Sequence, residues 1–331
     1  MSKTKSDFYH APGAPEDANA DYLVTATALG GRVRALSVRT TQLCNKAMQI
    51  HGTSPSATVA LGRFMTGSLL LASNLKGEND TITVNIRSDG PIRGMTAVCD
   101  SAGNVKAYCI EPIVETVLHE PGKLDISAVV GKGILTVVRD FGMKEPYIGS
   151  AELVSGEIGE DFAYFLGVSE QTRSVVSLGV LVDAEGVRHA GGFMVQLMPD
   201  AGDEVADYLE QRAAGGFPGV TFLLSEGMNP EKLLDMFLGD PEICFLSGRP
   251  VQYACSCSRE RMERSLTALG NKDLAELAED PEGITLECHF CGSKYHFDRT
   301  EIRDIRMNAT QAKDEISEKE SAYCPTTGAG Q

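Results

Sequence analysis

The sequence predicts an α+β protein. An N-terminal domain has a largely antiparallel sheet packed by helices, and it is followed by a helical linker and a small C-terminal domain built around four cysteines. Two observations predict this architecture. Strand-like and helix-like segments are mixed without the regular alternation that parallel sheets require. Two closely spaced pairs of cysteines lie near the C-terminus, where a metal could organise a small domain.

The first elements are two strands and two helices. Tyr22 to Ala28 and Arg32 to Val38 alternate around a glycine pair, which predicts a hairpin. Thr40 to Ile50 carries apolar residues at helical spacing. A second helix is expected to begin at Pro55, because proline suits the first helical position, and to run to about Leu75.

Further strands are expected where apolar and polar residues alternate between turn signals. These segments are Ile82 to Ile86, Met95 to Cys99, Val105 to Ile110, Ile134 to Arg139, Val175 to Val182 and Val187 to Met198. Between them, Glu157 to Val168 predicts a helix with Ile158, Phe162 and Phe165 facing inward.

After Pro199 the sequence predicts a linker of marginal local stability. Asp203 to Ala214 and Pro230 to Leu238 read as short helices joined by a glycine-rich stretch. The apolar residues of the linker must rest on something, and the N-terminal domain is the nearest candidate. They are Val205, Leu209, Phe222, Leu223, Leu224, Leu233, Leu234, Met236 and Phe237.

The C-terminal domain is expected to contain two short helices and a hairpin. Ser258 can cap a helix that presents Met262, Leu266 and Leu269 on one face, and Asn271 can cap the second helix. The hairpin strands are Ile284 to Cys288 and Lys294 to Phe297, which places a C-x-x-C motif at the tip.

The chain therefore divides into five parts. We expect a disordered tail over residues 1–20, a core domain over 21–199, a metastable linker over 200–250, the cysteine domain over 251–308 and a flexible tail over 309–331.

Composition excludes several classes of protein. The 331 residues are 42% hydrophobic and 23% charged, as in soluble globular proteins. The net charge of −16 argues against nucleic acid as a partner, because such proteins usually carry a basic surface. No apolar run is long enough for a membrane span, and the polar N-terminus is not a signal peptide. We therefore expect a cytoplasmic protein with reduced thiols.

The most informative residues are Cys255 and Cys257, a C-x-C motif, and Cys288 and Cys291, a C-x-x-C motif. Four thiolates around one point suit a tetrahedral structural zinc site with one zinc per chain. The same sulfurs can instead pair two and two as disulfides. A site with two mutually exclusive chemical states can act as a switch.

Nearby polar residues have open roles. His289 or His296 could replace a thiolate, but four cysteines already fill a tetrahedral site, so both are expected to point outward. Arg259, Arg261 and Lys294 could lower the pKa of the thiols, or they could simply form a solvated surface.

The other cysteines are scattered. Cys44, Cys99 and Cys109 lie in apolar segments and are expected in the core, whereas Cys244 and Cys324 have no partner nearby in sequence.

No motif predicts hydrolysis or phosphoryl transfer, so we expect a protein that is not an enzyme. Two other functions stay open. A zinc-ribbon nucleic-acid binder conflicts with the negative charge. A thiol–disulfide oxidoreductase would place its C-x-x-C motif at a helix N-terminus rather than at a hairpin tip.

The chain resembles the Hsp33 family of redox-regulated chaperones, and the resemblance covers roughly Tyr22 to Asn308. The motifs that carry it are Cys255-Ser-Cys257-Ser-Arg-Glu-Arg, Cys288-His-Phe-Cys291-Gly, Ser88-Asp89-Gly90-Pro91, the Val-Ser-Gly-Glu-Ile run within Gly149 to Glu160, Ser169-Glu170-Gln171-Thr172 and Ala190-Gly191-Gly192-Phe193-Met194.

The resemblance implies an ATP-independent holdase that is inactive while its four cysteines hold zinc. Oxidation is then expected to release zinc and form the disulfides Cys255–Cys257 and Cys288–Cys291. The linker unfolds, the core domain mediates formation of a homodimer, and unfolding client proteins are bound. Clients pass afterwards to ATP-dependent foldases.

Overall fold

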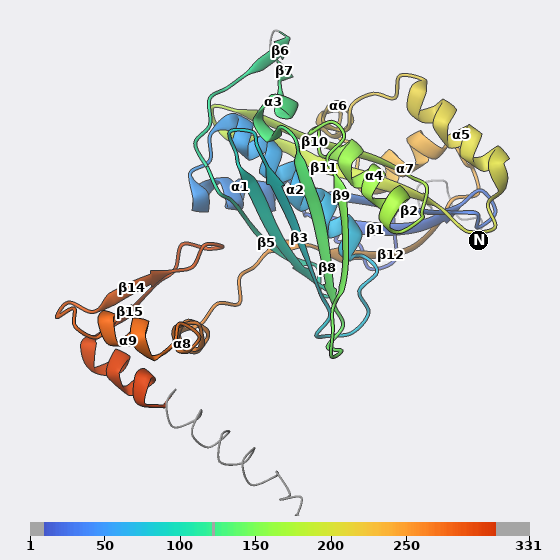
Figure 1. The fold of residues 1–331 in the computed structure, drawn as a ribbon. Helices are drawn as coiled ribbons and strands as arrows, with labels where there is room; N and C mark the ends of the chain where they lie inside the picture. Colours follow the sequence, from blue (N-terminus) through green and yellow to red (C-terminus); the bar gives the residue numbers. More distant parts are fainter. Residues whose placement is uncertain (1–9, 121–122, 309–331) are drawn as a thin grey trace, which may run out of the picture. The chain divides into compact units, whose positions relative to one another are not determined.

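The computed structural model describes residues 10–120 and 123–308 (Figure 1). The chain forms two compact units, one up to Ala254 and one from Cys255, and each is described on its own. The predicted α+β class, with antiparallel sheets and helices, is confirmed. Within the described residues, no helix is long and apolar enough to cross a membrane.

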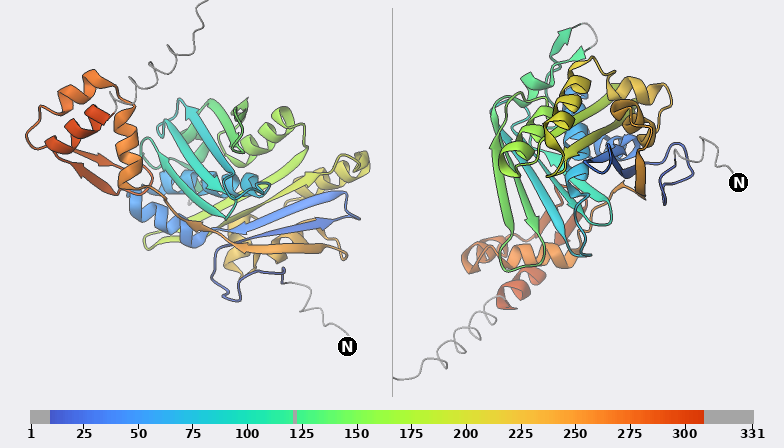
Figure 2. Two further views of the ribbon diagram at one scale, coloured as in Figure 1. Left: turned by 90° about the horizontal axis from the view of Figure 1, so that it is seen from below. Right: turned by 90° about the vertical axis from the view of Figure 1, so that its right-hand side faces the viewer.

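The first unit contains a five-stranded antiparallel sheet with the order β10-β11-β2-β1-β12. Its strands are β1 (Tyr22–Ala28), β2 (Val33–Arg39), β10 (Ser174–Asp183), β11 (Gly186–Leu197) and β12 (Cys244–Pro250). The two predicted hairpins, β1–β2 and β10–β11, are confirmed, with bounds that differ from the prediction by at most one residue. Figure 2 shows β12, in orange, alongside β1, in blue, although the two strands are far apart in sequence.

A second sheet has six strands in the order β13-β5-β4-β3-β8-β9. They are β3 (Thr81–Ser88), β4 (Gly94–Asp100), β5 (Asn104–Cys109), β8 (Gly133–Asp140), β9 (Tyr147–Glu152) and β13 (Gln252–Tyr253). All neighbours are antiparallel except β13 and β5. The sequence did not predict β9, β13 or the short hairpin of β6 (Leu118–Glu120) and β7 (Lys123–Leu124).

Helix α2 (Pro55–Ala72) contacts strands of both sheets and forms the centre of the first unit. Every residue of this helix is buried except Pro55 and Arg63. It ends at Ala72, three residues before the predicted end, although Leu75 is still buried in the core. The other helices of this part are α1 (Thr41–His51), α3 (Ile126–Val130) and α4 (Gly159–Ser169). The inward positions predicted for α4, including Phe162 and Phe165, are confirmed.

Residues 202–238 pack on the other face of the five-stranded sheet. Alternate residues of the strands serve two cores: Leu36 and Met194 face the core around α2, whereas Ala35 and Phe193 face a second core. That second core is covered by α5 (Gly202–Ala214), α6 (Val220–Ser225) and α7 (Pro230–Leu238).

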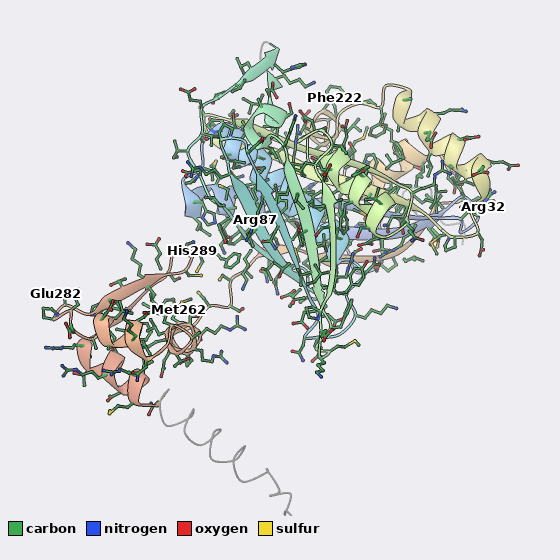
Figure 3. All side chains as sticks on the ribbon, viewed as in Figure 1. Arg32, Arg87, Phe222, Met262, Glu282 and His289 are labelled. Carbon is green, nitrogen blue, oxygen red and sulfur yellow. The ribbon has the colours of Figure 1, made fainter. Side chains whose placement is uncertain are left out.

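Two apolar residues of this region are not where the sequence placed them. Phe222 and Met236 were expected to rest on the N-terminal domain, but they are 58% and 39% exposed. Figure 3 labels Phe222 on α6. The neighbouring Leu223 and Leu224 are buried, because the short helix turns them toward β11 instead.

Strand β12 was not predicted, since Gly248 and Pro250 weaken the strand pattern in sequence. Its partner is β1, with Tyr22 opposite Pro250 and Thr27 opposite Cys244. Because β1 and β12 are so far apart in sequence, no local sequence pattern indicates that they pair.

The predicted disordered tail over residues 1–20 is wrong for residues 10–20. Ala11 is completely buried and packs with Tyr22 and Val24. The segment is polar in composition, which suggested disorder. It is held in place by hydrogen bonds to residues far away in sequence, and composition does not reveal such contacts. Residues 1–9 and the predicted flexible tail over 309–331 lie outside the described residues.

The second unit contains α8 (Arg259–Thr267), α9 (Asn271–Leu277), the hairpin of β14 (Ile284–Glu287) and β15 (Lys294–Phe297), and a further helical segment over residues 299–308. The cap by Ser258 is confirmed, since its hydroxyl accepts from the N–H of Arg261 at 3.3 Å. The predicted cap by Asn271 is wrong. Gly270 occupies the cap position, and the Asn271 side chain accepts from Arg306 instead.

A small core holds the second unit together. Its buried members are Leu266, Leu274, Ala278, Phe297, Ile302 and Ile305, with Cys288 buried nearby. Leu269 was predicted on the inner face of α8 but is 48% exposed, because α8 ends before it at Thr267. The helix over 299–308, which was not predicted, adds Ile302 and Ile305 to this core.

Candidate metal centre

Local structure brings each cysteine into position. Cys255 and Cys257 lie directly before α8, whose first turn is fixed by the Ser258 cap. Cys288 follows β14, and Cys291 lies in the turn that leads to β15. The turn is closed by a hydrogen bond of 2.9 Å from the N–H of Cys288 to the carbonyl of Ser293.

The turn between β14 and β15 also folds back on Cys288. The carbonyl of Cys288 accepts from the N–H of Cys291 at 3.2 Å and from the N–H of Gly292 at 2.8 Å. Gly292 has a φ of +69°, a conformation that favours glycine. The C-x-x-C-G sequence therefore encodes a tight turn with both sulfurs on one side.

The four sulfurs form one cluster. All four Sγ atoms lie within 4.8 Å of one another. The Sγ atoms of Cys255 and Cys288 are 3.8 Å apart, and those of Cys257 and Cys291 are 3.3 Å apart. A tetrahedral zinc–thiolate site with bonds of about 2.3 Å has sulfurs about 3.8 Å apart. The separations fit a metal ion, and they are too long for disulfides, in which the S–S distance is about 2.0 Å.

Two hydroxyl groups lie against the cluster. The phenolic oxygen of Tyr295 is 3.1 Å from the Sγ of Cys257. The Ser293 hydroxyl is 3.2 Å from the Sγ of Cys291. The sequence analysis missed both residues, although the alternation in β15 places Tyr295 on the same face as buried Phe297 and so contained the signal.

The thiols differ in their electrostatic surroundings. Burial, followed by the neighbouring thiols, raises the pKa of Cys255 to about 12. Burial also raises the pKa of Cys288. Burial acts in the same direction on Cys291, but hydrogen bonds from Ser293 outweigh it and lower the pKa of that thiol to about 7. A bound cation would favour the thiolate at all four positions.

The basic residues near the cluster make other contacts. Arg259 donates to the carbonyl of His296 at 2.8 Å and to Glu301 at 2.6 Å, and it stacks over the Phe297 ring. Arg261 donates to the Ser256 hydroxyl at 2.8 Å. These contacts favour a structural role on a solvated surface over a role in lowering the thiol pKa values.

Both histidines lie outside the sulfur cluster, as expected. His289 is exposed at the hairpin end, where Figure 3 labels it. His296 is exposed, and its Nδ1 lies 3.2 Å from the Thr285 hydroxyl. Among the described residues, the group that could hold a metal consists of the four cysteines alone.

The remaining cysteines are far from this chemistry. Cys44, Cys99 and Cys109 are buried in the first unit, which confirms them as core residues. Burial raises the pKa of Cys109 to about 11 and raises those of Cys44 and Cys99 as well. Cys244 is exposed on β12, and Cys324 lies outside the described residues.

The chain combines an α+β domain with a small C-terminal unit in which four thiols cluster. It therefore belongs to the class of proteins that carry a C-terminal cysteine module that could bind a metal ion. The sequence profile of the protein family described as "Hsp33 protein" matches residues 21–298 of this chain. This chain belongs to the Hsp33 family.

Similar proteins agree with this assignment. The 33 kDa chaperonin of Ruminiclostridium cellulolyticum is 49% identical over 285 residues, which cover 86% of this chain and 97% of the relative. The 33 kDa chaperonin of Acetivibrio thermocellus is 43% identical over 85% of this chain and 95% of the relative. The crystal structure of the 33 kDa chaperonin (heat shock protein 33 homolog) from Thermotoga maritima superposes with a TM-score of 0.80 at 33% identity and covers 88% of this chain and 100% of that one.

Proposed function

We propose that this chain is an ATP-independent holdase chaperone whose activity is controlled by the oxidation state of four cysteines. The observation that carries the proposal is the cluster of Cys255, Cys257, Cys288 and Cys291, with all four sulfurs within 4.8 Å. Membership of a family whose relatives are called chaperonins supports the chaperone function, with unfolding proteins as clients.

In the reduced, inactive state the four cysteines bind one zinc as thiolates. Zinc, when bound, ties two segments that are far apart in sequence to one point. The unit around it has a small apolar core, and units of this size usually need a metal or disulfides to stay folded. A structural zinc of this kind contributes on the order of 10 kcal/mol to folding.

Oxidation by a peroxide removes the ligands. Two thiolates lose two electrons and form one S–S bond, while the O–O bond of hydrogen peroxide breaks and its oxygens take up two protons from solvent and leave as two water molecules. Two such reactions consume all four thiols, so no thiolate remains to hold the metal, and the second unit loses its main source of stability.

We assign the disulfides to Cys255–Cys257 and Cys288–Cys291. The Sγ atoms of Cys257 and Cys291 are 3.3 Å apart, those of Cys255 and Cys288 are 3.8 Å apart, and all four sulfurs lie within 4.8 Å, so the folded geometry alone does not select the pairs within one motif. The resemblance to the Hsp33 family implies these pairs, and each of them joins two cysteines of one motif. Such small loops constrain the unfolded chain very little, and they cannot replace the metal.

Unfolding is expected to spread from the second unit into residues 200–250. Release of α5, α6 and α7 would uncover the apolar face of β2 and β11, which includes Val33, Ala35, Phe193 and Val195. A large exposed apolar surface suits the binding of unfolded chains. The net charge of −16 keeps such a state soluble.

In this proposal the oxidised protein forms a homodimer through the domain over residues 21–199 and later transfers clients to ATP-dependent foldases. It works in the cytoplasm and binds neither nucleic acid nor membranes. The position of the C-x-x-C motif speaks against a thiol–disulfide oxidoreductase, since Cys288 and Cys291 lie in a hairpin turn and not at a helix N-terminus.

One experiment tests the proposal. Zinc content, free thiols and suppression of client aggregation are measured before and after peroxide treatment. We expect one zinc and no suppression in the reduced protein, then loss of zinc, loss of four thiols and gain of suppression after treatment. Suppression by the reduced, zinc-loaded protein equal to that of the oxidised protein would refute the redox control.

A further inference from the structure

Residues 10–20 make a buried contact with α7. The N–H of Ala11 donates to the Oε1 atom of Glu231 at 3.0 Å, and the hydroxyl of Tyr22 on β1 donates to Oε2 at 2.7 Å. Glu231 is completely buried. A buried carboxylate depends on its donors, since losing one leaves a desolvated acceptor. Glu231 therefore joins three segments of the chain: residues 10–20, β1 and α7.

The same segment covers the β12 edge of the five-stranded sheet. β12 is the terminal strand of that sheet, and the N–H of Gly248 on it donates to the carbonyl of Pro12 at 2.7 Å. The two backbones approach closely. A Cβ atom on Gly248 would lie 2.7 Å from the Cβ of Ala14, and one on Gly13 would lie 2.8 Å from the carbonyl oxygen of Gly248. Glycine at both positions allows this close packing.

The other end of the segment is attached to β2 and α1, which lie outside residues 200–250. The guanidinium of Arg39, the last residue of β2, donates to the carbonyl of Ala18. The side chain of Gln42 on α1 donates to the carbonyl of Asn19 at 2.8 Å. One end of the segment is thus held by β2 and α1, and the other end holds α7 and β12.

From these contacts we propose that residues 10–20 form a strap that keeps α7 and β12 on the sheet and so raises the threshold for chaperone activation. Both elements belong to the segment 200–250, whose release is part of the proposed function, and the regulatory consequence rests on that function. The strap precedes the region that matches the Hsp33 family, which begins at residue 21. It therefore adds a control to the fold that the family region itself does not contain.

Two variants remove the strap in different ways. One lacks residues 1–14. The other, Ala11→Asp, places a second carboxylate against buried Glu231 and so expels the strap without shortening the chain. The control is Glu16→Gln, which changes the charge of an exposed side chain in the same segment. Hydrogen exchange is measured on the reduced, zinc-loaded proteins, together with the peroxide exposure needed for half-maximal suppression of client aggregation.

We expect exchange of the Gly248 amide and of the α7 amides to become about tenfold faster or more in both strap variants, in keeping with the loss of two hydrogen bonds. The amides of β3 should not change, and Glu16→Gln should match the wild type. Both strap variants should also be activated at lower peroxide exposure.

If the amides of Gly248 and α7 exchange at the wild-type rate in both variants, the strap proposal is wrong. It is also wrong if the amides of β3 are accelerated as much as those of α7. Faster exchange with unchanged peroxide dependence would overturn its regulatory role. If neither wild type nor variants suppress aggregation after oxidation, while exchange at α7 and β12 still accelerates, the proposed function fails and the strap stands.

Discussion

The hydroxyl of Tyr295 lies 3.1 Å from the Sγ of Cys257, and the ring of the same tyrosine packs against the small core of the second unit. Tyr295 thus connects the sulfur cluster to the side chains that hold the unit together. Groups that donate hydrogen bonds to metal ligands fix the orientation of those ligands and influence metal affinity.

Replacing Tyr295 with Phe removes the hydroxyl and keeps the ring. We expect this variant to fold and to bind zinc about tenfold more weakly, because Cys257 loses the donor that orients it. Competition with a chelator measures the affinity. Thr285→Val serves as the control, since it removes a hydroxyl that contacts His296 on the same hairpin but no sulfur. Equal zinc affinity of Tyr295→Phe and wild type would refute this role.

Replacing Cys288 with Ser should abolish zinc binding. Cys288 is the most buried of the four cysteines, and a serine hydroxyl at that position is a poor zinc ligand. Native mass spectrometry should show one zinc on the wild type and none on the variant. The amides of the second unit should lose protection from exchange, because the small core alone is insufficient. A variant that keeps its full zinc content would exclude Cys288 as a ligand.

The other five cysteines should be dispensable for switching. Cys44, Cys99 and Cys109 are buried in the first unit, Cys244 is exposed on β12, and Cys324 belongs to the C-terminal tail. Replacing all five with Ala or Ser should cost about 1 kcal/mol for each buried position through altered packing. Oxidation-dependent suppression of aggregation should survive. A folded variant that no longer responds to peroxide would show that one of these thiols takes part.

Asp21 should make the first unit less stable as the pH rises. Burial, opposed by hydrogen bonds such as the one from the Leu43 N–H at 2.8 Å, raises the pKa of this carboxyl to about 6. The unfolded chain has a pKa near 3.8, so the folded state binds the proton more tightly. The resulting stabilisation is complete below about pH 4 and is lost as the pH rises through 6.

The variant Asp21→Asn tests this dependence, because it imitates the protonated carboxyl at every pH. We expect it to be more stable than wild type by about 2 kcal/mol at pH 7.5 and nearly equal to it at pH 4. Denaturant unfolding of the first unit at both pH values gives the comparison. A variant that is less stable than wild type at pH 7.5 would contradict the assigned direction.

Much of the first unit could be predicted from local sequence patterns. The hairpins β1–β2 and β10–β11 carry strong alternation around turn residues, and α2 and α4 carry long apolar faces. Strand β12 could not be predicted, because Gly248 and Pro250 interrupt the alternation typical of a strand. Its partner β1 is also more than 200 residues earlier in the sequence, so no local pattern indicates the pairing.

The candidate site divides in the same way. Spacing alone grouped the four cysteines, since metal ligands within one motif must be close in sequence. The alternation in β15 predicts that Tyr295 faces inward, but its contact with Cys257 depends on how the hairpin meets the segment before α8, which no local pattern encodes. The bond between Ala11 and Glu231 likewise depends on the tertiary fold, so a polar composition wrongly suggested disorder.

The central claim is that oxidation unfolds the second unit and residues 200–250, including the edge strand β12, while the strands of the first unit that precede residue 200 persist. Hydrogen exchange across the whole chain, before and after peroxide treatment, tests it most directly. We predict that amides from about residue 200 onward lose protection together with the zinc, whereas those of β3 and β10 keep it. Equal loss of protection in β3 and α7, or retained protection in α8 and β15 after zinc release, would contradict the account.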